Sequence, residues 1–168
     1  MNDPDDNLNF VRPMRAPIKV AIVDDDAPMR RALARLMRSA GIEAATFTSA
    51  DEFLRSAIRQ QVDCAVSDLR MPGFDGLRLQ QELTKSLPYL SLVFISGYGD
   101  IPTSVRALKD GAVDFLVKPV NGNTLLAAVS RAAERSRALK GRTASWQPRI
   151  TSPRVSATAQ TNQAAAFP

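Results

Sequence analysis

The chain has 168 residues, of which 45% are hydrophobic and 23% are charged, and its formal net charge is +5. This length predicts one folded domain with tails, and no apolar run approaches the roughly 18 residues that a membrane span requires. The sequence contains no histidine, which excludes histidine-based acid–base catalysis and phosphohistidine transfer by this chain. Its single cysteine cannot form an internal disulfide, and the acidic N-terminus lacks the apolar run of a signal peptide. We therefore expect a cytoplasmic protein without membrane association.

Composition divides the chain into three parts. Residues 1–16 are polar and contain two prolines, which predicts a flexible leader. Residues 140–168 carry four basic side chains and no acid, and their high content of Ser, Thr, Gln, Ala and Pro predicts a disordered basic tail. Residues 17–139 remain as the predicted folded domain. Because the excess of positive charge lies mostly in the tail, direct DNA binding by the folded domain is not expected.

Five apolar segments alternate with five amphipathic segments between the tails. The apolar segments predict strands at 18–23, 42–47, 64–68, 90–95 and 113–117. The amphipathic segments predict helices at about 27–40, 49–59, 76–86, 101–109 and 124–139. The expected helix caps are Asp26, Ser49 in a capping box with Glu52, and either Asn121 or Asn123.

Several predicted strands are apolar at every position, which is typical of a parallel sheet covered by helices on both faces. Right-handed crossovers between such strands produce a doubly wound sheet. We therefore predict an α/β fold with a five-stranded parallel sheet in the order 2-1-3-4-5, which is a flavodoxin-like three-layer sandwich.

Four of the five predicted strands end next to a side chain suited to phosphate or metal chemistry. These side chains are Asp24 and Asp25 after the first strand, Asp68 after the third, Ser96 after the fourth and Lys118 after the fifth. In a parallel sheet these strand ends meet at one edge. Clustered carboxylates repel one another unless a cation lies among them, and an all-oxygen ligand set selects a hard cation, for which Mg²⁺ is expected. A carboxylate can also act as a nucleophile, so Asp68 is predicted to accept a phosphoryl group.

The same residues resemble the receiver domain of bacterial response regulators in two-component signalling. The segments VDDD, SDLRMPGFDG, FISG and FLVKP occur in the family's order over about residues 17–138. The resemblance implies that Asp68 is the phosphorylated aspartate. It also implies that Asp24, Asp25, Asp68 and the backbone carbonyl of Arg70 hold Mg²⁺.

The resemblance further implies a conformational switch. Ser96 and Phe115 match the hydroxyl and aromatic switch positions, and Lys118 matches the lysine that pairs with the phosphate. The Lys118–Pro119 peptide bond is then expected to be cis. Rearrangement of these residues is expected to repack the surface of the fourth helix, the fifth strand and the last helix for dimerisation or partner binding.

The resemblance implies a phosphoacceptor that is modified by a sensor histidine kinase, and not an ordinary enzyme. The closest likeness is to the nitrogen-fixation type of regulator, which ends in a LuxR-type helix-turn-helix domain. The residues after 139 are too few for such a domain, so a truncated transcriptional regulator that reaches DNA through its tail or a partner is an alternative. A phosphatase of the haloacid-dehalogenase type, with its nucleophile at Asp24, is a weaker alternative because it leaves Asp68 without a role.

Overall fold

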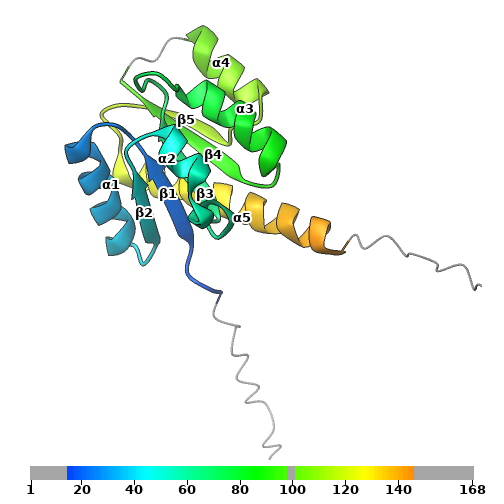
Figure 1. Ribbon diagram of the computed structural model, residues 1–168. Helices are drawn as coiled ribbons and strands as arrows, with labels where there is room; N and C mark the ends of the chain where they lie inside the picture. Colours follow the sequence, from blue (N-terminus) through cyan, green and yellow to red (C-terminus); the bar gives the residue numbers. More distant parts are fainter. Residues whose placement is uncertain (1–14, 98–100, 146–168) are drawn as a thin grey trace, which may run out of the picture.

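The computed structural model describes residues 15–97 and 101–145, and strands alternate with helices throughout (Figure 1). The strands are β1 (Lys19–Val23), β2 (Glu43–Phe47), β3 (Cys64–Asp68), β4 (Ser91–Ser96) and β5 (Asp114–Val117). The helices are α1 (Ala27–Ser39), α2 (Ala50–Arg55), the 3₁₀ helix η1 (Ala57–Gln60), α3 (Gly76–Ser86), α4 (Ile101–Lys109) and α5 (Gly122–Ser145). Most of the predicted leader and most of the predicted tail lie outside the described residues.

The five strands form one parallel sheet in the order β2-β1-β3-β4-β5, which confirms the predicted topology. Helices α1 and α5 cover one face of the sheet, and α2, α3 and α4 cover the other, so the molecule has three layers (Figure 1). The strand register places Asp68 of β3 beside Ile95 of β4, and Ser96 beside Val117 of β5. The carboxyl ends of the strands therefore meet at one edge, as the sequence predicted.

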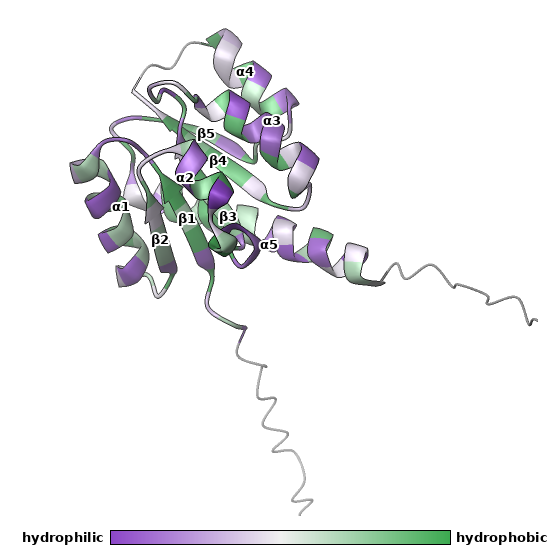
Figure 2. Ribbon diagram, in the orientation of Figure 1, coloured by the Kyte–Doolittle hydropathy of each residue, from purple (hydrophilic) through white to green (hydrophobic). Residues whose placement is uncertain are grey.

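Side chains of the central strands alternate between two hydrophobic cores. On β1, Val20 and Ile22 pack with α1 and α5, whereas Ala21 and Val23 pack with the helices of the opposite face. Every residue of β3 and β4 is buried, and the central strands are predominantly hydrophobic (Figure 2). Burial on both faces explains why these segments are apolar throughout and do not alternate with polar residues.

One prediction about helix ends is confirmed in position but not in its side-chain contact, and another needs correction. Asp26 occupies the N-cap position of α1, but its side chain accepts no capping hydrogen bond. Its backbone N–H instead donates to Asp24 Oδ1 at 2.8 Å. The helix predicted over 49–59 is divided at Ser56, whose extended backbone ends α2 and whose hydroxyl caps η1 by accepting from the N–H of Ile58. The Ser49 cap of α2 and the bounds of α3 and α4 agree with the prediction.

Helix α5 is longer than predicted: it ends at Ser145, whereas the predicted helix ends at residue 139. Six residues that we expected to belong to a disordered tail are therefore helical. Lys140 anchors the first of these residues, since its ammonium donates to the carbonyls of Gln60 and Val62 and lies 4.9 Å from the centre of the Tyr89 ring. The added turns run past the end of the sheet (Figure 1).

An ion pair between Asp63 and Arg137 ties α5 to the start of β3. The Asp63 carboxylate accepts from Arg137 Nε at 3.0 Å, from Arg137 Nη2 at 2.8 Å and from the Lys19 N–H at 2.9 Å. Burial opposes ionisation of Asp63, but these hydrogen bonds outweigh it and hold the pKa of the carboxyl below its usual value. The ionised form is therefore the one that the fold stabilises.

We expect Asp63→Asn to lower the free energy of unfolding at pH 7 by about 1–3 kcal/mol, because it weakens charge-assisted hydrogen bonds. A lowered pKa stabilises the fold at pH values above the unfolded pKa of about 3.9, and this contribution is lost as the pH falls through the folded pKa. Urea unfolding of wild type and Asp63→Asn, measured at pH values from about 7 down to about 2.5, should therefore show that their free energies of unfolding converge in acid. Asp51→Asn, which removes an exposed ion pair with Arg55, is the control with a small expected effect. A stability difference for Asp63→Asn that does not change with pH would contradict the assignment.

Candidate functional site

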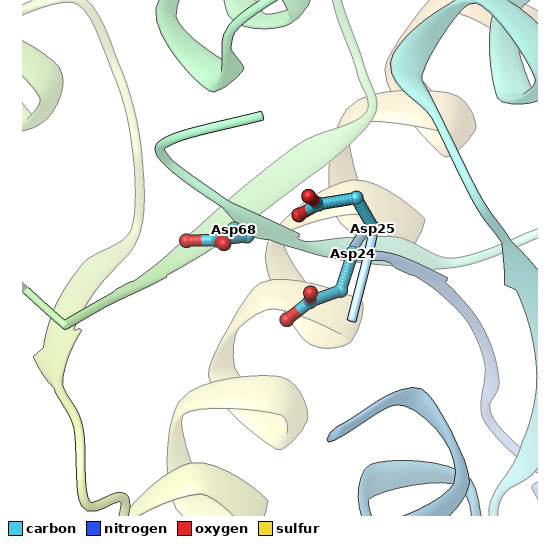
Figure 3. A group of neighbouring side chains, drawn as sticks. All are labelled: Asp24, Asp25 and Asp68. Carbon is cyan, nitrogen blue, oxygen red and sulfur yellow. The ribbon is translucent and has the colours of Figure 1, made fainter. Parts of the chain in front are cut away.

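Three carboxylates meet at the carboxyl edge of the sheet. Asp24 and Asp25 follow β1, Asp68 ends β3, and each contributes an oxygen that lies within 4.8 Å of the other two (Figure 3). Asp24 and Asp68 are buried, whereas Asp25 is exposed. Such a group is suited to a hard divalent cation because all of its ligands are oxygens. The predicted convergence of these strand ends is confirmed.

Lys118 supplies positive charge to this cluster. Its Nζ lies 3.4 Å from Asp24 Oδ2 and 3.5 Å from Asp68 Oδ2, and its side chain is 20% exposed. Burial raises the pKa of Asp24, and the neighbouring Asp68 adds to this effect, although Lys118 and the Asp26 N–H oppose it. One ammonium does not balance three carboxylates, so an additional cation would relieve the remaining repulsion.

Ser96 and Lys118 lie at the same carboxyl edge of the sheet as this cluster, and Phe115 lies earlier on β5. Ser96 is fully buried at the end of β4, and its carbonyl accepts from the Lys118 N–H at 2.8 Å. The Lys118–Pro119 peptide bond is cis, as predicted. Phe115 is half-buried on β5, and its ring centroid lies 6.4 Å from that of Phe94. Arg70 is exposed, and its N–H donates to Asp68 Oδ1 over a long 3.4 Å.

Arg30 on α1 contributes a contact that the sequence did not reveal. Its guanidinium donates to the carbonyl oxygens of Asp24 at 2.7 Å and Asp25 at 3.0 Å. These bonds brace the segment that presents the two acids. The sequence contains no signal that separates Arg30 from the other arginines of α1, because only the course of α1 after this segment brings its guanidinium to these carbonyls.

Gly76 is the second residue whose role the sequence did not reveal. A Cβ at this position would lie 2.7 Å from the carbonyl oxygen of Asp68, 2.7 Å from the Phe94 ring and 3.0 Å from Leu69 Cα. The Gly76 N–H also donates to the Leu69 carbonyl at 2.9 Å. The start of α3 therefore packs directly on the backbone of Asp68.

Comparison with known families agrees with this geometry. Residues 20–130 match the model of the response regulator receiver domain. The chain belongs to this family. Receiver domains are phosphoacceptors and not catalytic enzymes in the ordinary sense, and the aspartate cluster of this domain is typical of the Mg²⁺ site of the family. The match leaves the phosphatase alternative without support.

Two curated relatives illustrate the likeness and its extent. Nodulation protein W of Bradyrhizobium diazoefficiens is 48% identical over 118 residues, which cover 70% of this receiver chain and 52% of that protein. Transcriptional regulatory protein FixJ of Azorhizobium caulinodans is 39% identical over 119 residues, which cover 71% of this chain and 56% of that protein. The chain thus spans about half the length of these relatives.

Solved structures show the same similarity in three dimensions. Response regulator StyR superposes with a TM-score of 0.66 at 42% sequence identity, and the match covers 77% of this chain and 67% of that one. The structure named FixJ-N superposes with a TM-score of 0.64 at 36% identity and covers 71% of this chain and 95% of that one. Among the described residues of this receiver domain, no helix combines the length and apolar character needed to cross a membrane.

Proposed function

We propose that this protein is a cytoplasmic phosphoacceptor switch in which a sensor histidine kinase phosphorylates Asp68 in a Mg²⁺-dependent reaction. The observation that carries the proposal is the cluster of Asp24, Asp25 and Asp68, whose oxygens lie within 4.8 Å of one another. The contacts of Lys118 with both buried acids support it further. Together these groups provide a nucleophile, ligands for a metal and a positive charge for the phosphoryl oxygens.

In the proposed reaction an Asp68 oxygen attacks the phosphorus of phosphohistidine. The phosphorus–nitrogen bond breaks, the imidazole of the kinase leaves, and an acyl phosphate remains on Asp68. Asp24, Asp25, Asp68 and the Arg70 carbonyl would hold Mg²⁺, which neutralises phosphoryl charge during transfer. Lys118 would release its contact with Asp68 and pair with the phosphoryl oxygens.

The phosphate would then bias a switch between two packings. Its oxygens would attract the hydroxyl of Ser96, and Phe115 would rotate into the space that Ser96 vacates. Because Phe115 already packs partly in the core beside Phe94, such a rotation changes the surface formed by α4, β5 and α5. A local change in charge would thereby control a larger surface. Moving the population from mostly inactive to mostly active requires roughly 5 kcal/mol of differential stabilisation.

Helix α4 carries an apolar face suited to dimerisation or to a protein partner. The exposed large hydrophobic residues here are Ile101 (76%), Val105 (42%) and Leu108 (44%) of α4 and Val117 (52%) of β5. The three residues of α4 recur at helical spacing, so they lie along one side of the helix. An apolar strip of this kind on a soluble domain is typical of an interaction surface.

We expect Val105→Asp to abolish phosphorylation-dependent dimerisation, because it places a charge at the centre of this strip. Light scattering coupled to size exclusion, before and after treatment with acetyl phosphate and Mg²⁺, measures the effect. Ile58→Asp is the matched control, since Ile58 is 40% exposed on η1, away from α4. A Val105→Asp protein that still dimerises on phosphorylation would place the interface elsewhere.

Removal of divalent cations is expected to stop labelling of wild-type protein by acetyl phosphate. Without a metal, the phosphoryl oxygens approach three carboxylates and a single ammonium, and repulsion opposes transfer. Intact-mass spectrometry in EDTA, followed by titration with Mg²⁺, tests this. Full labelling in EDTA would contradict a metal site at the cluster.

A transcriptional role remains the second candidate. It is favoured by the name of the FixJ relative, a transcriptional regulatory protein that is about twice as long as the matched region. In this version, residues 140–168 or a partner would contact DNA. DNA affinity that falls steeply with salt and disappears when residues 140–168 are removed would support it.

A further inference from the structure

Three arginines on α1 form a row without acidic partners. Arg31, Arg35 and Arg38 are all exposed, and we call them the arginine row. Within residues 15–97 and 101–145, none of the three makes an ion pair or a side-chain hydrogen bond. Other arginines do have carboxylate partners, namely Arg15, Arg55, Arg106, Arg131 and Arg137. The positive charge of the row is therefore not paired with an acid, whereas the charge of these five arginines is.

The spacing of the row makes this arrangement unfavourable on its own. Arg31 and Arg35 are four residues apart and Arg35 and Arg38 are three apart, so like charges are neighbours on the helix. Helix α1 contains no acidic residue. Arg30, which precedes the row on α1, interacts electrostatically with Glu52. The Glu52 carboxylate accepts hydrogen bonds from the N–H and the hydroxyl of Thr48 in its own segment. An anion bound along the row would remove the repulsion.

A hollow of about 360 Å³ lies between the arginine row and strand β2. Its lining consists of Ala27, Arg30, Arg31, Ala34, Arg35, Arg38 and Thr46. The short side chains of the two alanines leave this space open, and Thr46, exposed on the edge strand, adds a hydroxyl. The volume falls at the lower end of the range of small-molecule sites, roughly 300–1,000 Å³.

We propose that this hollow binds a small ligand that contains a chain of two or more phosphate groups. Guanidinium groups bind phosphate oxygens in a bidentate manner, and arginine is the only basic residue in the lining. From Arg31 to Arg38 the helix rises about 10 Å, which matches a short polyphosphate chain better than the longer contact surface of a nucleic acid. An acidic protein surface could pair with the charges of the arginine row, but it would not require a hollow beside them. Within this lining, Arg30 also contacts the segment that presents Asp24 and Asp25, whereas the described contacts show no hydrogen bond or ion pair between the arginine row and that segment.

Binding of inorganic triphosphate and of ATP to the full chain, measured by titration calorimetry without Mg²⁺, tests this proposal. We expect Arg35→Glu/Arg38→Glu to weaken binding of both by at least about tenfold, because it removes two of the three guanidiniums and adds two repulsive charges. Arg106→Glu/Lys109→Glu on α4 changes the net charge equally and should bind as wild type does. Equal affinity of ATP and triphosphate would mean that phosphates alone are recognised, and tighter ATP binding would mean that the nucleoside contributes.

Two results would overturn the proposal. One is that the arginine-row variant and the α4 variant bind triphosphate with equal affinity, which would mean that any change in binding depends only on net charge. The other is tighter binding of a short DNA duplex than of triphosphate through the same arginines. Both variants retain Arg30 and the aspartates, so each should still be labelled by acetyl phosphate with Mg²⁺. That labelling reports the proposed phosphoacceptor function independently of the outcome at the row.

Discussion

Asp68→Asn is expected to eliminate phosphoryl labelling of the protein by acetyl phosphate and Mg²⁺. The asparagine amide has nearly the same shape as the carboxylate but is not a nucleophile toward phosphorus. The change also removes one of three clustered negative charges, so we expect the folded state to be no less stable than that of wild type. Loss of labelling would then report chemistry and not unfolding.

Asp75→Asn provides the matched control for this experiment. Asp75 is exposed at the N-cap of α3, where its side chain accepts from the Arg78 N–H at 2.8 Å. Its loss should leave labelling intact, because Asp75 is not part of the carboxylate cluster. Intact-mass spectrometry measures the phosphoryl adduct, and thermal unfolding checks the fold of both variants. Labelling that persists in Asp68→Asn would overturn the assignment of the acceptor.

Gly76→Ala is expected to destabilise the protein by about 1–3 kcal/mol and to slow labelling of Asp68. The added methyl group would lie 2.7 Å from the Asp68 carbonyl oxygen and 2.7 Å from the Phe94 ring. The first neighbour is backbone and the ring is fully buried, so neither moves easily. Relief of the contact must shift either the start of α3 or the segment that carries the acceptor.

Gly141→Ala separates this steric effect from helix propensity. Gly141 lies within α5, and nothing is within 4 Å of the position that its Cβ would occupy. The same substitution should therefore stabilise the protein by up to about 1 kcal/mol. Urea unfolding gives both values, and the rate of labelling is followed in parallel. If Gly76→Ala were as stable as wild type and labelled at the same rate, the close packing of α3 on Asp68 would be refuted.

The fold followed from patterns that act locally or through the cores. Uninterrupted apolar segments predicted strands that are buried on both faces, and β3 and β4 are buried at every residue. The alternation of strands and helices then left few topologies, and the observed strand order is the predicted one. Strand ends were equally informative, because a parallel sheet brings all of its carboxyl ends to one edge. The sequence alone therefore places Asp24, Asp25 and Asp68 together.

The ends of two helices could not be predicted, because they depend on residues distant in the sequence or on backbone angles that composition does not encode. Helix α5 continues past residue 139, where Lys140 reaches carbonyls near β3, about eighty positions earlier in the chain. The division of the second predicted helix at Ser56 depends on a backbone angle that a helical pattern does not exclude.

The sequence alone thus determined the layers, the strand order and the set of residues at the carboxyl edge, because short local segments of sequence specify hydrophobic periodicity and strand ends. Only the tertiary structure distinguished Arg30 from the other arginines of α1 and showed that Gly76 packs on the Asp68 backbone. It also showed that Arg31, Arg35 and Arg38 border a hollow without acidic partners in the described part of the chain. These roles depend on distances between elements, which arise only when the helices pack against the sheet.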